Sequence, residues 1–221
     1  MAITTLYFVR HGETDYNRHG IVQGRGVDAP LNEHGQRQAE ALARRFAEVA
    51  LDAIYTSPLQ RARATAEAVR QYHPDLPFYQ MADLEEMDWG DLEGKPCAPP
   101  YDAQIRRIYE RWQAGDYAYP VPGGESVLDV QRRALRALQT ILARHEGEAV
   151  LVVTHGRFLR ILLASILPEY GLARMEALPH TNTAVNHLVC ENGRFRALRL
   201  NCTAHLEGLA VKAERATEVV A

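Results

Sequence analysis

The 221-residue sequence has few cysteines, and they are not grouped. Cys97, Cys190 and Cys202 are widely spaced, and they form neither a CxxC pair nor the cysteine and histidine spacing of a zinc site. This excludes a small scaffold built on disulfides and a zinc-finger module. We expect three reduced thiols in a cytoplasmic protein.

Long apolar runs and runs of like charge are also missing. The longest apolar stretch, residues 158–167, is interrupted by Arg160 and is too short to cross a bilayer. Residues 1–7 lack the basic start, apolar core and cleavage site of a signal peptide. Lys and Arg number 25 against 28 Asp and Glu, which gives a net charge of −3 without a basic stripe. We therefore expect neither a membrane nor a nucleic acid as a partner.

Strand-type runs alternate with amphipathic segments, and the 47% hydrophobic content suffices for a buried core. Strands are predicted over residues 3–9, 51–56, 77–81 and 149–154, with a terminal hairpin over 184–200 that turns at Asn192-Gly193. Helices are predicted over residues 32–50, 57–71, 102–113, 126–145 and 157–167, the second with Ser57 as N-cap and Pro58 as first residue. The alternation predicts an α/β fold, a three-layer αβα sandwich around a mostly parallel sheet.

Residues 94–124 differ in composition from the rest of the chain. Prolines stand on both sides of the predicted helix over 102–113, which is rich in aromatic and charged residues. We expect residues 1–221 to form a single domain into which residues 94–124 are inserted as a small helical cap. The tail from about Lys212 is expected to fray.

Two histidines stand where predicted strands end. His11 lies in the segment Arg10-His11-Gly12-Glu13-Thr14 after the first strand, and His155-Gly156 ends the strand over 149–154. Because the carboxyl ends of parallel strands meet at one edge of a sheet, we expect these two loops to share a rim. Six of the seven other histidines are interpreted as surface or hydrogen-bonded structural residues: His19, His34, His73, His145, His180 and His187.

The residue types at this rim suit the chemistry of a phosphoryl group. Arg10 and Arg61 could clamp an anion with their guanidinium forks, helped by the N-terminus of the helix that carries Arg61. His11 could attack phosphorus as a neutral imidazole, with His155 protonated beside the anion. A carboxyl group would donate a proton to the leaving oxygen, and no metal is needed. The candidates for that acid are Asp83, Glu85, Glu86 and Asp88.

A series of short motifs follows in order along nearly the whole chain. These are RHGET over residues 10–14 with Asn17, Gln23-Gly24, LNEHG over 31–35, SPLQRA over 57–62, LEEMDWGDLEG over 84–94, Gly124-Glu125-Ser126, Thr154-His155-Gly156 and Asn182-Thr183. In these motifs the chain resembles the histidine phosphatase superfamily, in its phosphoglycerate mutase-like branch. That branch includes broad-specificity phosphatases, α-ribazole phosphatases and cofactor-dependent mutases.

The resemblance implies a role for each matching residue. It implies that His11 is phosphorylated and that Arg10, Arg61 and His155 hold the phosphoryl group. Asn17 would add a polar contact. It further implies the following three assignments: Glu86 as the proton donor, Glu85 as a solvated loop acid, and Gln23 as a neighbour of the substrate.

Several functions share this set of residues. We favour hydrolysis of small phosphomonoesters, because Lys95 and the stretch 97–100 replace the basic segment of a mutase. The function of a 2,3-bisphosphoglycerate-dependent phosphoglycerate mutase is an alternative, because Arg106 and Arg107 are basic. More remote alternatives are a non-catalytic binder of phosphorylated ligands and a metal-dependent hydrolase. The expected partner is a small phosphorylated metabolite, with no cofactor, and a homodimer is one assembly left open.

Overall fold

The computed structural model describes residues 2–209, so the frayed tail expected from about Lys212 lies outside the described residues. A six-stranded sheet forms the centre, in the order β3-β2-β4-β1-β5-β6. The strands are β1 (Thr4–Arg10), β2 (Ala53–Thr56), β3 (Phe78–Gln80), β4 (Ala149–Thr154), β5 (Val185–Glu191) and β6 (Arg194–Cys202). β1, β2, β3 and β4 pair in parallel, while β5 runs antiparallel to both β1 and β6.

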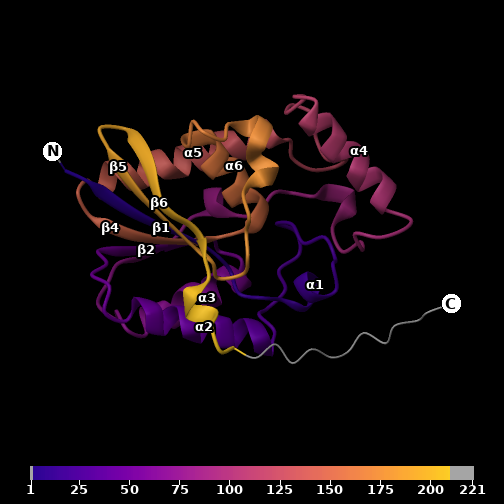
Figure 1. Ribbon diagram of the computed structural model, residues 1–221. Coiled ribbons are helices and arrows are strands. Elements are labelled where there is room, and N and C mark those ends of the chain that lie inside the picture. The colour runs from indigo at the N-terminus through magenta and orange to yellow at the C-terminus, as the bar shows by residue number, and fades with distance from the viewer. Residues whose placement is uncertain (1, 210–221) are drawn as a thin grey trace.

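Helices cover both faces of the sheet (Figure 1). The α-helices of the chain are α1 (Asp15–Arg18), α2 (Glu33–Phe46), α3 (Gln60–Arg70), α4 (Asp102–Gln113), α5 (Val127–Arg144) and α6 (Gly156–Ile166). In this view α5 and α6 lie above the sheet, and α2 and α3 lie below it. The three-layer α/β fold expected from the sequence is confirmed.

Alternate side chains of the central strands serve the two cores. Val150 and Val152 of β4 pack into the apolar cluster on the α5 and α6 side, whereas Leu151 and Val153 pack into the cluster on the α2 and α3 side. All four are fully buried. A strand buried on both faces is continuously apolar, which is why its sequence carries no polar alternation.

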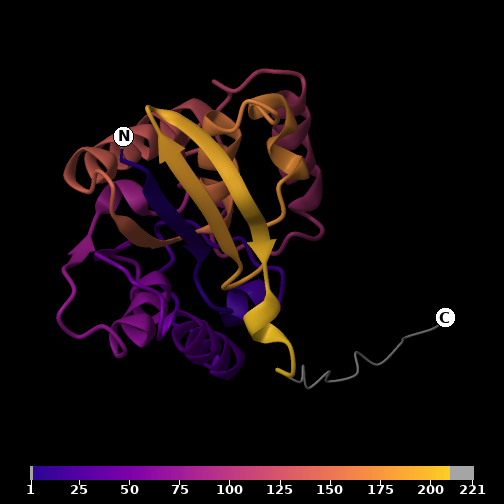
Figure 2. The same cartoon turned by 60° about the vertical axis from the view of Figure 1, so that its left-hand side comes forward.

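The terminal hairpin of β5 and β6 extends the sheet, and it is seen face on in Figure 2. Its turn is Asn192-Gly193, with φ values of 51° and 73°. Positive φ at both central residues is the requirement of a tight type I′ hairpin, so the predicted turn is confirmed. Among the helices of residues 2–209, none is long and apolar enough to span a bilayer.

The start of α3 differs from the prediction. The helix begins at Gln60 with Leu59 as its N-cap residue, so Ser57 and Pro58 precede it. The Ser57 hydroxyl accepts a hydrogen bond from the Leu59 N–H at 3.3 Å and lies 2.8 Å from His155 Nε2. Ser57 therefore contributes its side chain to the edge of the sheet rather than to the end of the helix.

Candidate active site

His11 lies just beyond the carboxyl end of β1, with its side chain buried. Its Nδ1 is 2.7 Å from the carbonyl oxygen of Gly12. Because a carbonyl only accepts, Nδ1 carries the proton and Nε2 keeps a free lone pair. Burial, followed by the charges of Arg61 and Arg10, holds the pKa of His11 well below its usual value. The ring is therefore a neutral potential nucleophile at neutral pH.

The loop that carries His11 packs tightly against the start of α2. A Cβ atom on Gly12 would lie 2.6 Å from the carbonyl oxygen of Gly35, and one on Gly35 would lie 2.0 Å from that of Glu13. The Gly12 N–H donates to Thr65 Oγ1 at 3.0 Å. Only glycine permits this approach of two backbones, so the loop fixes the position of the imidazole.

His155, at the end of β4, faces His11 across the rim. Their ring centroids are 5.2 Å apart. The expectation that an anion bound beside His155 protonates its ring stays a prediction. Burial lowers the pKa of His155 well below its usual value, and the positively charged Arg61 lowers it further.

Arg10 and Arg61 approach the histidines from different elements. Arg61 is fully buried and donates to the carbonyl oxygens of Gly24 at 3.0 Å and Val27 at 2.8 Å. Arg10 donates to the carbonyl oxygen of His180 at 2.7 Å. Burial lowers the pKa of each guanidinium to about 10, so both remain charged at neutral pH.

The N-terminus of α3 already has a partner. The Gln60 N–H donates to Asp28 Oδ1 at 2.7 Å, so a carboxylate from a distant loop caps the helix. This bond satisfies one of the free N–H groups at the helix start. The expectation that the helix N-terminus helps to bind an anion stays a prediction.

Glu86 extends from the acidic loop to the N-terminus of α6, with only 7% of the residue exposed. Its Oε1 accepts hydrogen bonds from the N–H groups of Met87 at 2.8 Å and Phe158 at 3.0 Å, and its Oε2 accepts one from Arg157 at 3.0 Å. The first N–H groups of a helix have no acceptor within the helix, and here the Glu86 carboxyl group accepts from two of them. The carboxyl group is thereby fixed beside His155, which is the N-cap residue of the same helix.

Glu85 points away from this position. Its carboxylate forms an ion pair with Arg25 and has 17% of its side-chain surface exposed. The interpretation of Glu85 as a solvated loop acid is wrong in that respect, because the acid has a fixed partner. Within residues 2–209, Glu86 is the member of the four candidate acids that lines the cavity described next.

A cavity of about 160 Å³ opens beside His11 and brings most of the predicted residues together. Asn17 and Gln23 both lie in its wall. Asn17 Oδ1 accepts a hydrogen bond from Asn182 Nδ2 at 3.2 Å. With its amide oxygen toward Arg61, Gln23 accepts from that guanidinium at 3.1 and 3.2 Å and donates to Thr14 Oγ1 at 2.8 Å. The lining residues are Arg10, His11, Asn17, Val22, Gln23, Glu86, Trp89, Cys97, Ile105, Tyr109, Arg157 and His180.

His180 also lies in this wall, which the sequence did not predict. The interpretation of His180 as a structural histidine missed this position. His180 Nδ1 accepts a hydrogen bond from Arg160 Nε at 2.8 Å. Burial and the neighbouring arginines lower the pKa of His180 to about 3, so the ring is neutral. Its place two residues before the Asn182-Thr183 motif was the available signal.

Known proteins resemble this chain over almost its whole length. The model of the histidine phosphatase superfamily (branch 1) matches residues 6–203. The uncharacterized phosphatase PhoE of Bacillus subtilis strain 168 is 31% identical over 206 residues, covering 93% of this chain and 98% of that protein. Putative phosphoserine phosphatase 2 of Hydrogenobacter thermophilus is 30% identical, covering 92% and 98%. The structure of Bacillus stearothermophilus YhfR has a TM-score of 0.82 at 38% identity, covering 92% of this chain and 99% of that one. The chain therefore belongs to the histidine phosphatase superfamily, as its motifs indicated.

Proposed function

We propose that this protein hydrolyses small phosphomonoesters through a phosphohistidine on His11. The observation that carries the proposal concerns two buried atoms beside the neutral His11 ring. Arg10 Nε and His155 Nδ1 have no hydrogen-bond partner among the residues that the structure describes. When Ser57 donates to His155 Nε2, the proton of His155 is on Nδ1, so both atoms can donate to a phosphoryl oxygen.

The proposed reaction has two displacements. In the first, His11 Nε2 attacks phosphorus, the ester P–O bond breaks, and protonated Glu86 gives its proton to the leaving oxygen. In the second, Glu86 removes a proton from water, which attacks phosphorus and releases inorganic phosphate from His11. Arg10, Arg61 and His155 stabilise the charge on the phosphoryl oxygens in both steps.

The cavity also supports a substrate with a small organic group. Its volume of about 160 Å³ accommodates a phosphoryl group with few further atoms. Cys97, Ile105 and Tyr109 close one side of it, and all three come from the segment 94–124. This supports the proposal that the segment is a cap within a single domain.

The position of two arginines favours hydrolysis over mutase activity. Arg106 and Arg107, the residues that left a mutase open, are both exposed, and Arg106 forms an ion pair with Asp102 at 3.5 Å. Neither belongs to the cavity wall among residues 2–209. Assays with 3-phosphoglycerate test this point: we expect release of inorganic phosphate, and fast isomerisation primed by 2,3-bisphosphoglycerate with negligible release would contradict it.

The cellular setting belongs to the same proposal. Cys97, Cys190 and Cys202 are all free thiols, which supports a cytoplasmic location. A homodimer stays a prediction, which sedimentation of the purified protein would test.

Trapping the intermediate tests the function directly. The protein is incubated with a phosphomonoester that carries a labelled phosphoryl group and is then quenched in alkali. We expect protein-bound label that is stable in alkali and labile in acid, and that is lost in His11→Ala. Variant His19→Ala, whose residue is exposed, is the matched control and should keep the label. Absence of both label and turnover across a broad panel of phosphoesters would overturn the proposal in favour of a non-catalytic binder.

A further inference from the structure

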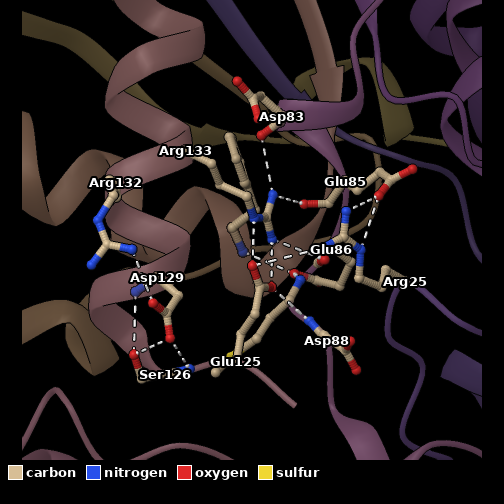
Figure 3. Close-up of polar contacts among 12 residues, drawn as sticks. Arg25, Asp83, Glu85, Glu86, Asp88, Glu125, Ser126, Asp129, Arg132 and Arg133 are labelled. Atoms are coloured by element: carbon tan, nitrogen blue, oxygen red, sulfur yellow. Dashed lines mark hydrogen bonds and ion pairs between the residues drawn. The ribbon is translucent and has the colours of Figure 1, made fainter.

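Arg133 is a buried arginine of α5. It is not one of the residues that line the cavity in the described part of the chain. Its side chain contacts the backbone of the loop that carries Glu86 (Figure 3). Its Nη1 donates to the carbonyl oxygens of Asp83 at 3.1 Å and Glu85 at 2.6 Å. Its Nη2 donates to the carbonyl oxygen of Glu86 at 3.0 Å. The guanidinium thus holds three carbonyl groups of one short segment.

Glu125 completes the contacts of this guanidinium. Its Oε1 accepts from Arg133 Nε at 2.9 Å, and its Oε2 accepts from Arg133 Nη2 at 3.0 Å. Glu125 also binds the far side of the same loop, because Oε2 accepts from the Asp88 N–H at 2.9 Å and the Glu125 N–H donates to the Asp88 carbonyl oxygen at 2.9 Å. The pair therefore holds the loop both before and after Glu86.

The number and arrangement of these hydrogen bonds require an arginine. A guanidinium has five N–H donors in a fixed plane, and each of the five has an acceptor here. Lysine has three donors on one atom and could not span the same carbonyl groups. Arg133 also lies over the ring of Phe158, at 5.4 Å from the centroid, and the Phe158 N–H is one of the donors to the Glu86 carboxyl group.

We propose that Arg133, paired with Glu125, is a positioning residue that sets the Glu86 carboxyl group for proton transfer. The inference rests on the proposed function, in which Glu86 protonates the leaving oxygen. The main chain of Glu86 is held by Arg133 and its side chain by Met87 and the start of α6, so the carboxyl group has one position relative to His11. Proton transfer requires that position, because a displacement of about 1 Å can cost about a hundredfold in rate.

The test compares two leaving groups in Arg133→Met. An alkyl phosphate such as glycerol 3-phosphate needs a proton on its leaving oxygen, whereas p-nitrophenyl phosphate leaves readily without one. We expect kcat/KM to fall about tenfold more for the alkyl than for the aryl substrate. A larger change of the ratio in the same direction should appear in Glu86→Gln, and adding Arg133→Met to Glu86→Gln should not increase it further.

Arg136→Met is the matched control. Arg136 lies on the same helix and binds the same loop, but it is exposed and pairs with the Asp83 carboxylate at 2.6 Å rather than with backbone. We expect its ratio of alkyl to aryl activity to equal that of the wild type. The ratio is independent of the folded fraction, and Glu125→Gln gives a second, milder route to the same change if Arg133→Met yields little folded protein.

The outcomes separate the inference from the function on which it rests. If Glu86→Gln changes the ratio but Arg133→Met and Glu125→Gln lower both activities equally, the positioning role is overturned and the function stands. If Glu86→Gln leaves the ratio unchanged, the acid is misassigned and the inference falls with it. If the wild-type protein hydrolyses neither substrate, the proposed function itself is overturned.

Discussion

The two ends of the active-site cavity are built in opposite ways. At the inner end His11 and Arg10 line the cavity, while His155 and Arg61 lie next to this end without lining it. All four come from strand ends and α3 and are held by backbone carbonyl groups and a hydroxyl. The outer end is apolar and aromatic and includes Trp89, Ile105 and Tyr109, the last two from α4. The inner end is therefore lined by polar and charged side chains, whereas the outer end is lined mainly by bulky apolar ones.

Arg157 is one residue that joins the outer end to the inner end. Arg157, the second residue of α6, extends toward α4, where its guanidinium lies 4.8 Å from the Tyr109 ring centroid and 5.9 Å from that of Trp89. It also forms an ion pair with Glu176 and a hydrogen bond with the Tyr109 hydroxyl. Under the proposed function, chemistry and substrate selection rest on different elements, so we expect that each can be changed separately.

The largest effect that would sharpen this comparison is expected from Glu86→Gln. Loss of a general acid should slow hydrolysis of alkyl phosphates by roughly a hundred- to ten-thousandfold, and that of p-nitrophenyl phosphate much less. Steady-state kinetics on both substrates measures the difference. Glu85→Gln is the control, and if it shows this pattern instead, the acid is Glu85.

Arg61→Ala should come next. It removes a buried cation from the inner end, and we expect kcat to fall by about a hundred- to a thousandfold for every phosphomonoester, with weaker inhibition by inorganic phosphate. It also leaves the carbonyl groups of Gly24 and Val27 without their donor, a loss of about 1–3 kcal/mol each in unfolding free energy if they stay buried. Arg63→Ala, on the exposed side of α3, is the control for both measurements.

A smaller and substrate-dependent effect is expected at the outer end. Ile105→Ala should change kcat/KM about tenfold for substrates with an apolar organic group and leave that for glycerol 3-phosphate nearly unchanged. Gln104→Ala, an exposed neighbour on α4, should change neither. A uniform loss for all substrates in Ile105→Ala would break the comparison, because the cap would then serve the chemistry itself.

The smallest effect concerns protonation at the inner end. Because burial and two arginines lower the pKa of His11, its ring should stay neutral as the pH falls from 7.5 through 6.5, and should gain a proton only well below that. The nitrogen NMR signals of labelled histidine measure this, and the His11 signals are those lost in His11→Ala. A titration midpoint of His11 near pH 6.5 would show that its ring is more exposed to solvent, and less affected by the two arginines, than the structure indicates.

Much of the architecture could be predicted because its signals are local. The apolar run of β4, the helix starts at Asn32 and Ser126 and the Asn192-Gly193 turn each depend on neighbouring residues, and each occurs as expected. The start of α3 could not be predicted from neighbouring residues. Its cap is Asp28, which is 32 residues away in sequence from Gln60.

The sequence by itself determined the fold class, the family and the placement of His11 and His155 at one edge of the sheet. Only the tertiary structure decided how those residues behave. It showed that burial and the neighbouring Arg61 lower the pKa of His155, that His180 lies in the cavity wall, and that Arg133 holds the loop of Glu86. The reason is physical: protonation and orientation depend on burial and on the charges packed around a group, and those neighbours come from segments far apart in the chain.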